Sequence, residues 1–176
     1  QGHPCACREN QPVLKEDGTL LLKQGYHEDG IFMTRDYSHL NIPDNPTKEQ
    51  IEQAKNVLED LIAEFPFKDE TAKAAAISAL VTSALRSSLD FVPMFAVRAP
   101  SRGCGKSAFV SVCSIIHAGV VAPPIGYVSD EKEITKRIET VIHAGDTFIN
   151  LDNYNGVLYN NTLCQLITEE KLLFRV

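Results

Sequence analysis

One short stretch, Ala99-Pro100-Ser101-Arg102-Gly103-Cys104-Gly105-Lys106-Ser107, decides which fold this sequence is expected to adopt. It carries two glycines separated by one residue and ends in Lys-Ser. Glycines let successive backbone N–H groups converge on one anion, and a helix that starts there adds partial positive charge. An apolar run at 94–97 precedes the stretch and an apolar segment at 106–118 follows it, closed by Gly119. The pattern therefore predicts a buried strand, a phosphate-binding loop and a helix.

This loop indicates a P-loop that binds ATP. Lys106 would reach the β- and γ-phosphates, and Ser107 would place its hydroxyl on Mg²⁺. The full motif has glycine at position 100, where this chain has Pro100. The alternative is a chance glycine turn beside an exposed lysine. The residues expected to line the nucleotide are Pro100, Ser101, Arg102, Gly103, Cys104, Gly105, Lys106 and Ser107.

A thiol inside the loop is a second consequence of the motif. Cys104 would lie at a helix N-terminus, where the local field lowers the pKa of a thiol. We therefore expect Cys104 to react with an alkylating agent faster than Cys113 and to be protected by Mg-ATP. The alternative is a buried, inert thiol.

An acidic residue that follows a later strand is the expected second part of the site. Asp152 ends the apolar stretch 147–151 and would hold Mg²⁺ through water. The alternative is an aspartate that caps a turn. Asn153 stands where many motor ATPases have glutamate, and an amide orients water but does not usefully accept its proton. Either hydrolysis is slow, or another carboxylate serves, for which the candidates are Glu131, Glu133, Glu169 and Glu170.

The remainder of the C-terminal half alternates between strand and helix patterns. Residues 125–128 are a strand candidate, and a charged amphipathic helix starts at Asp130 or Glu131. Its inward positions would be Ile134, Ile138, Val141 and Ile142. Strands that alternate with helices predict a parallel sheet with right-handed crossovers. The expected fold class is therefore α/β, a P-loop NTPase sheet that is incomplete at the C-terminal end.

Two further regions precede this core. Residues 1–46 contain apolar runs broken by Asp17-Gly18 and Asp29-Gly30, which favour tight turns and predict a β-hairpin module with a linker. Residues 47–90 form a helical preface of two helices, the first with a capping box at Thr47 and Gln50 and the second from 71 to 88. The ATPase core is expected over 91–176. The apolar face of the first helix, which Pro66 would stop, comprises Ile51, Ala54, Val57, Leu58, Leu61, Ile62 and Phe65.

Composition limits the classes of function. Hydrophobic residues make up 44% and charged residues 23% of the chain, an ordinary balance for a globular protein. The formal net charge of −6 provides no global positive field for nucleic acid. Five scattered cysteines favour a reducing cytoplasm, and no apolar run is long enough to span a membrane. His3, Cys5 and Cys7 could be half of a metal site or an ordinary tail. Both ends are expected to be edges of an excerpt, with a strand cut at 172–176.

Several segments resemble the ATPase part of primase–helicase proteins of phages and integrative elements, which belong with superfamily 3 and AAA+ helicases. The strongest are residues 99–107, Glu133-Ile134-Thr135-Lys136-Arg137 and Ile149-Asn150-Leu151-Asp152-Asn153. Weaker ones are Leu166-Ile167-Thr168 with Arg175, Asp17-Gly18, Gly25-Tyr26 and Phe65-Pro66-Phe67. In that group Asp-Asn is an acceptable second motif.

The resemblance implies an AAA+-like ATPase that drives DNA translocation. Single-stranded or forked DNA and copies of the same chain, assembled into a ring that is usually a hexamer, would be its partners. Lys106, Asp152 and Asn153 would be the catalytic residues, with ATP and Mg²⁺ as cofactors, and a sensor Asn and an arginine finger would lie further on. The alternatives are a nucleotide-binding regulatory module with little hydrolysis and a small P-loop kinase.

Overall fold

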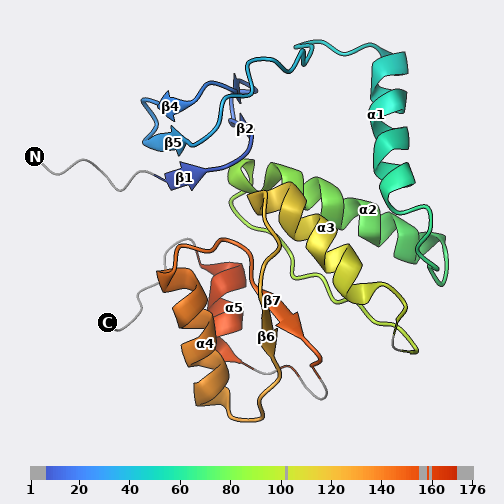
Figure 1. Ribbon diagram of the computed structural model, residues 1–176, viewed down its shortest axis with the longest axis vertical. Helices are drawn as coiled ribbons and strands as arrows, with labels where there is room; N and C mark the ends of the chain where they lie inside the picture. The colour runs from blue at the N-terminus through green and yellow to red at the C-terminus, as the bar shows by residue number, and fades with distance from the viewer. Residues whose placement is uncertain (1–6, 102, 155–157, 159, 170–176) are drawn as a thin grey trace, which may run out of the picture.

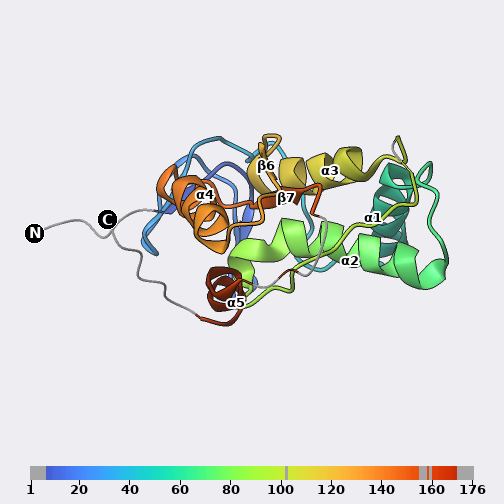
Figure 2. The same cartoon turned by 90° about the horizontal axis from the view of Figure 1, so that it is seen from below.

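The computed structural model of the chain describes residues 7–101, 103–154, 158 and 160–169. It has a mixed α/β architecture with three parts (Figure 1). Small β-sheets form the N-terminal part, and two long helices cross the middle beside a separate first helix. Two further helices lie next to each other beside a small parallel sheet in the C-terminal part, as the second view also shows (Figure 2). Arg102 and the expected strand at 172–176 lie outside the described residues.

Turn chemistry forms the N-terminal sheets as predicted. Strands β2 (Val13–Leu14) and β3 (Leu20–Leu21) pair antiparallel across Asp17-Gly18, and β4 (Gly25–Tyr26) and β5 (Ile31–Met33) pair antiparallel across Asp29-Gly30. Gly18 and Gly30 adopt φ of +83° and +75°, which glycine tolerates and other residues avoid. A feature that the sequence did not predict is β1 (Cys7–Glu9), which pairs parallel to β5. Val13, Leu21 and Met33 form the local core.

The first helix, α1 (Lys48–Leu61), starts at the predicted capping box. Thr47 accepts a hydrogen bond from the Gln50 N–H, and the Gln50 side chain accepts one from the Thr47 N–H. The expected burial of its apolar face was wrong, because α1 stands apart from the other helices (Figure 1) and no residue within it is buried. Ile51 and Val57 remain 54% and 61% exposed. Only its C-terminal end reaches the core, through Leu58 and the residues that follow the helix.

Two neighbouring helices, α2 (Glu70–Leu85) and α3 (Lys106–Ala118), lie side by side and run in the same direction in both views (Figures 1 and 2). A short 3₁₀ helix, η1 (Arg86–Ser88), extends α2, so the predicted helix at 71–88 is confirmed to within a residue at its start. The predicted bounds of α3 and its Gly119 cap are confirmed as well. The core between these helices comprises Ile62, Ala76, Ala79, Leu80, Phe109 and Cys113.

A two-stranded parallel sheet organises the C-terminal part. Strands β6 (Pro124–Gly126) and β7 (Asn150–Asp152) pair with Ile125 opposite Leu151 and Gly126 opposite Asp152. Helix α4 (Glu131–His143) connects them, as the alternating pattern predicted, and Asp130 caps it. The sequence did not predict α5 (Asn161–Thr168), which Asn160 caps. Ile125, Ile134, Ile138 and Leu163 form the core that joins these elements.

The predicted strand before the phosphate loop was wrong. No strand is present between residues 91 and 99, and Phe91, Met94, Phe95 and Val97 are exposed. A strand exists only where a neighbour accepts and donates its backbone hydrogen bonds, and this segment has no such neighbour among the described residues. The second and third strand candidates form only in part: β6 covers 125–126 of the expected 125–128, and β7 covers 150–151 of the expected 147–151 and extends to Asp152. The parallel sheet therefore has two strands in the described part of the chain. Within those residues no helix is long and apolar enough to cross a lipid bilayer.

Candidate functional site

The phosphate-loop candidate turns on two glycines directly before α3. Gly103 and Gly105 adopt φ of +82° and +80°, a left-handed conformation that costs an L-residue about 1–2 kcal/mol. Gly105 is the N-cap of α3, and its carbonyl accepts the first helical hydrogen bond, from the Phe109 N–H at 2.9 Å. The glycine spacing that the sequence singled out therefore makes the bend from which the helix starts.

The start of α3 differs from the starts of the other α-helices in the described residues. A side chain accepts a hydrogen bond from a first-turn N–H in each of the other four, provided by Thr47, Asp69, Asp130 and Asn160. Helix α3 has no such side-chain cap and no acidic residue in its first turn. Its first N–H groups and the positive end of its dipole are thus left for a group outside the helix.

Cys104 lies inside this loop and contacts another loop residue. Its Sγ is 3.0 Å from the Ser101 Oγ. The hydrogen bond from Ser101 holds the pKa of the Cys104 thiol below its ordinary value, and the nearby Lys106 charge acts in the same direction. Burial raises the pKa of the Cys113 thiol. The difference between the two thiols has the predicted direction.

Asp152 and Asn153 form a compact pair at the carboxyl end of β7. The Asn153 N–H donates to Asp152 Oδ1 at 2.9 Å, and the Asn153 Nδ2 donates to Asp152 Oδ2 at 3.2 Å. Asn153 adopts φ of +54°, a left-handed conformation that asparagine tolerates better than most residues. The Asp152 carboxylate thus makes the turn contact that was the alternative to a metal role, while its side chain stays partly exposed.

The two motifs lie toward the same end of the fold. The segment that leads into β7 is held against the last turn of α3, where His117 Nε2 is 2.8 Å from Thr147 Oγ1 and the His117 ring is 6.1 Å from that of Phe148. From there β7 points toward the end at which α3 begins, as both views show (Figures 1 and 2). No hydrogen bond or ion pair joins the loop to Asp152 among the residues that the structure describes.

The oxygen donors expected for Mg²⁺ are of the right chemistry but are not in contact. Ser107 is exposed and Asp152 is half-buried, and hydroxyl and carboxylate oxygens are the ligands that Mg²⁺ prefers. Within the described ranges no three His, Cys, Asp or Glu side chains are grouped as a metal site. His3 and Cys5, two of the three residues proposed as half of an N-terminal metal site, lie outside the described residues.

The contact of Phe65 with the loop was not predicted from the sequence. A Cβ atom built on Gly105 would lie 2.9 Å from Cε1 of the Phe65 ring, so the ring rests directly on the loop. The same ring meets Phe109 of α3 edge-to-face at 5.9 Å between centroids. Phe65 was expected on the apolar face of the first helix and within a resembling segment, but nothing local in the sequence tells which residue a distant aromatic ring will touch.

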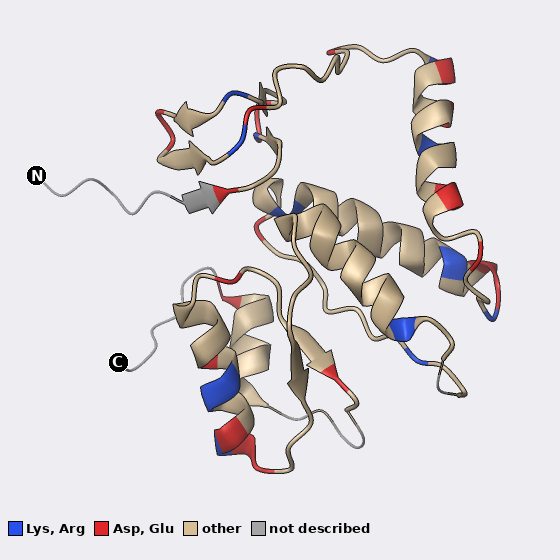
Figure 3. Ribbon diagram, viewed as in Figure 1, with Lys and Arg blue, Asp and Glu red and all other residues tan. Residues whose placement is uncertain are grey.

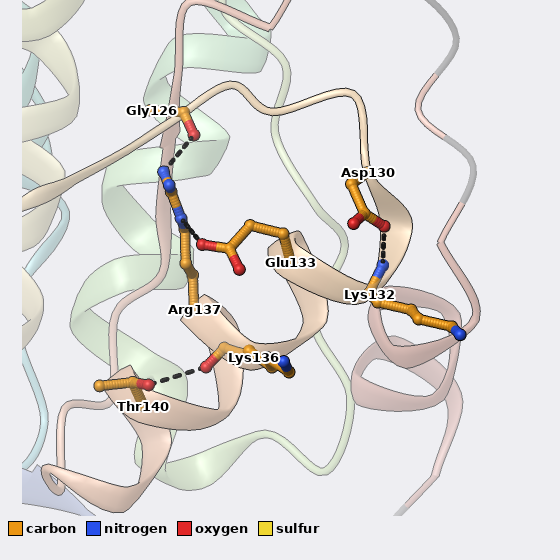
Figure 4. A network of polar contacts seen from close by, with 7 residues as sticks. All are labelled: Gly126, Asp130, Lys132, Glu133, Lys136, Arg137 and Thr140. Carbon is orange, nitrogen blue, oxygen red and sulfur yellow. Dashed lines mark hydrogen bonds and ion pairs between the residues drawn. The ribbon is translucent and has the colours of Figure 1, made fainter.

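A second residue whose place at the site was not predicted is Arg137 of α4, whose guanidinium lies at the carboxyl end of β6. Its Nε donates to Glu133 Oε1 at 3.0 Å and its Nη1 to the Gly126 carbonyl at 3.3 Å (Figure 4). Gly126 pairs with Asp152, so the Arg137 guanidinium lies at the same sheet edge as that carboxylate. Glu133, one possible substitute base, is held in this ion pair. Of the other candidates, Glu131 and Glu169 are exposed, and Glu170 lies outside the described residues.

Charge is unevenly spread around these elements. Acidic side chains predominate along α1 and around the connection between α1 and α2, whereas lysine begins α3 (Figure 3).

Comparison with protein-family models, with curated proteins and with solved structures gave no match to this chain. The site is therefore interpreted from its own geometry and from the residues named above.

Proposed function

We propose that this chain binds Mg-ATP at the start of α3, with the triphosphate on the loop that ends at Lys106. The observation that carries the proposal is the uncapped start of α3, which follows two left-handed glycines and bears a lysine. Free N–H groups, a helix dipole and a cationic side chain are the three elements that a phosphate requires. A glycine turn that arose by chance could precede a helix with a side-chain cap or with acidic residues in its first turn, and α3 has neither.

Individual residues would then have distinct tasks. The backbone of Gly103, Cys104 and Gly105 would surround the β-phosphate, and Lys106 would neutralise the outer phosphates. Ser107 and Asp152 would hold Mg²⁺, the latter through water. When bound, Mg²⁺ would neutralise charge on the phosphate oxygens. Asn153 would orient water near the γ-phosphate.

The wider proposal is a motor that hydrolyses ATP as part of a DNA helicase of the primase–helicase type, on a P-loop NTPase fold related to AAA+ proteins. It is supported by the resemblance of the three segments that carry Lys106, Arg137 and Asp152. Two of these segments meet at one edge of the β6–β7 sheet. Its partners would be single-stranded or forked DNA and further copies of the chain in a ring.

A nucleotide-binding regulatory module is the second candidate, and Asn153 favours it. Its side-chain amide and backbone N–H both donate to Asp152, and it has no group that accepts a proton from water. A module of this kind would bind Mg-ATP without appreciable turnover.

The two candidates separate in one set of assays on the chain and on its Lys106→Ala variant. Nucleotide binding is measured by titration calorimetry, and phosphate release is measured with and without single-stranded DNA. Binding together with DNA-stimulated release, both lost in the variant, supports the motor. Because the resemblance places the arginine finger further on, the chain alone is expected to release little phosphate under either candidate. Binding without release both by the chain and by a longer protein that contains it supports the regulatory module, and phosphate transfer to a small acceptor would indicate a kinase. Equal binding by the chain and the variant, or none by either, would contradict the proposal.

A further inference from the structure

We propose that Phe65 is a positioning residue that holds the phosphate loop in its bent form, so that the connection between α1 and α2 controls the nucleotide site. The ligand in this inference rests on the proposed function. The contact between ring and loop does not, and it is tested separately below.

The first observation is the close approach of the ring to Gly105. Two ring atoms, Cε1 and Cδ1, would lie 2.9 and 3.1 Å from a Cβ at this position. By contrast, a Cβ built on Gly103 would meet nothing within 4 Å. Glycine at 103 thus serves the backbone bend alone, whereas glycine at 105 serves the bend and also leaves room for the ring.

The second observation is that neighbouring rings hold the Phe65 ring and hydrogen bonds hold its backbone. The Phe65 ring packs edge-to-face on the buried ring of Phe109 in α3. The centroid of the Phe67 ring lies 6.3 Å from that of the Phe65 ring. The backbone is held as well, since the Phe65 N–H donates to the Ile62 carbonyl at 3.1 Å and the Phe67 N–H donates to the Phe65 carbonyl at 2.9 Å. Ile62 itself is fully buried. The backbone of the α1–α2 connection and the packing on Phe109 therefore both hold the ring at the loop.

The consequence is a mechanical link between the helical preface and the site. Gly105 precedes Lys106 directly, so a shift of the bend redirects the lysine and the first N–H groups of α3 together. A displacement of about 1 Å in a positioning element is enough to change rates or affinities many-fold. Any contact made by α1 that moves its C-terminal end would reach the loop through Phe65.

Phe65→Ala is the test, with Phe67→Ala as the matched control from the same core. The first readout needs no nucleotide: the pH profile of Cys104 alkylation, resolved by mass spectrometry. Loss of the ring should loosen the loop, disturb the contact between Ser101 and Cys104, and move half-maximal alkylation up by about half a pH unit or more. The second readout is Mg-ATP affinity, which should fall about tenfold or more. Phe67→Ala removes a neighbour of the Phe65 ring but keeps the contact between Phe65 and Gly105, so it should change both readouts less than Phe65→Ala does.

Thermal unfolding of both variants shows whether the fold survives, and Phe65→Leu, which keeps apolar volume, replaces Phe65→Ala if that variant does not fold. An unchanged Cys104 profile in a folded Phe65 variant overturns the inference, as does an equal change in Phe67→Ala. A shifted Cys104 profile in a chain that binds no Mg-ATP supports the positioning role and contradicts the proposed function instead.

Discussion

Helices α3 and α4 are equally long, at 13 residues, but their first turns are arranged in opposite ways. At α4, the Asp130 carboxylate accepts a hydrogen bond from the Lys132 N–H at 2.9 Å, and Glu131 and Glu133 add negative charge. At α3, a left-handed glycine takes the cap position, no side chain accepts a first-turn N–H, and the first residue is Lys106. One helix start is satisfied from within the chain and the other is not.

This difference indicates where an anion would bind. A capped, acidic first turn repels a phosphate and has already used a donor, whereas an open first turn with a lysine attracts one. Capping is worth about 0.5–2 kcal/mol to a helix, so leaving α3 uncapped costs stability that a ligand would return.

The largest effect is expected from Lys106→Ala. Loss of one charge-assisted contact to phosphate, worth roughly 1.5–3 kcal/mol, should weaken Mg-ATP binding by about 10- to 150-fold in a calorimetric titration. The matched control is Lys132→Ala in the first turn of α4, which should bind as the parent does. Similar losses in both variants would show that nucleotide responds to overall charge and not to the start of α3.

Gly105→Ala should affect both stability and binding. The φ of +80° and the Phe65 ring at 2.9 Å from the new Cβ predict a loss of about 1–2 kcal/mol or more in the free energy of unfolding, with weaker nucleotide binding. Asp130→Ala should cost about 1 kcal/mol through the lost cap of α4 and leave binding unchanged. Chemical denaturation and nucleotide titration of both variants check this. Loss of nucleotide affinity in Asp130→Ala would contradict the claim that the start of α3, and not that of α4, binds nucleotide.

Asp152→Asn should have a smaller effect on binding. The loop that surrounds the phosphates stays intact, but Mg²⁺ loses a charged partner, so the dependence of ATP affinity on Mg²⁺ should weaken while affinity without metal changes little. Titrations with ATP in Mg²⁺ and in EDTA measure this difference. The matched control is Asp146→Asn, an exposed aspartate shortly before β7. An undiminished Mg²⁺ dependence in Asp152→Asn would remove this residue from the site.

The smallest effect concerns the thiols. Because the pKa of Cys104 is lowered and that of Cys113 is raised, Cys104 should reach half-maximal alkylation at a lower pH. Its thiolate is present once the pH exceeds this lowered pKa, so the gap between the two rates should be widest at pH values between the pKa of Cys104 and that of Cys113. Mg-ATP should slow modification of Cys104 alone. Mass spectrometry with no nucleotide protection at Cys104 would contradict the loop geometry.

Local signals explain which features the sequence could predict. The capping box at Thr47 and the glycines that bracket α3 act within a few residues, so the start of α1 and both ends of α3 follow from them. The bend at Gly103 and Gly105 was predictable for the same reason. The end of α1 was not, since the helix ends at Leu61 and not at the expected stop before Pro66. The absence of a strand at 91–99 was not predictable, because an apolar run becomes a strand only where a neighbouring strand pairs with it, and no local pattern tells whether that neighbour is present.

Long-range contacts account for what was missed at the site. Phe65 and Gly105 are far apart in the sequence, and their contact depends on how the α1–α2 connection packs against α3. Arg137 reaches Gly126 only because α4 folds back along β6. The apolar pattern of α1 predicted a helix correctly but not its burial, since burial depends on a partner surface and not on periodicity.

The most direct test of the central claim is a titration of the ¹⁵N-labelled chain with Mg-ATP, followed through its amide resonances. If the start of α3 binds the phosphates, the largest shifts should occur at Gly103, Gly105, Lys106 and Ser107, in a saturable manner. The amides of Glu131, Lys132 and Glu133, at the capped start of α4, should stay in place. Shifts of equal size at both helix starts, or none at the start of α3 at saturating nucleotide, would contradict the account.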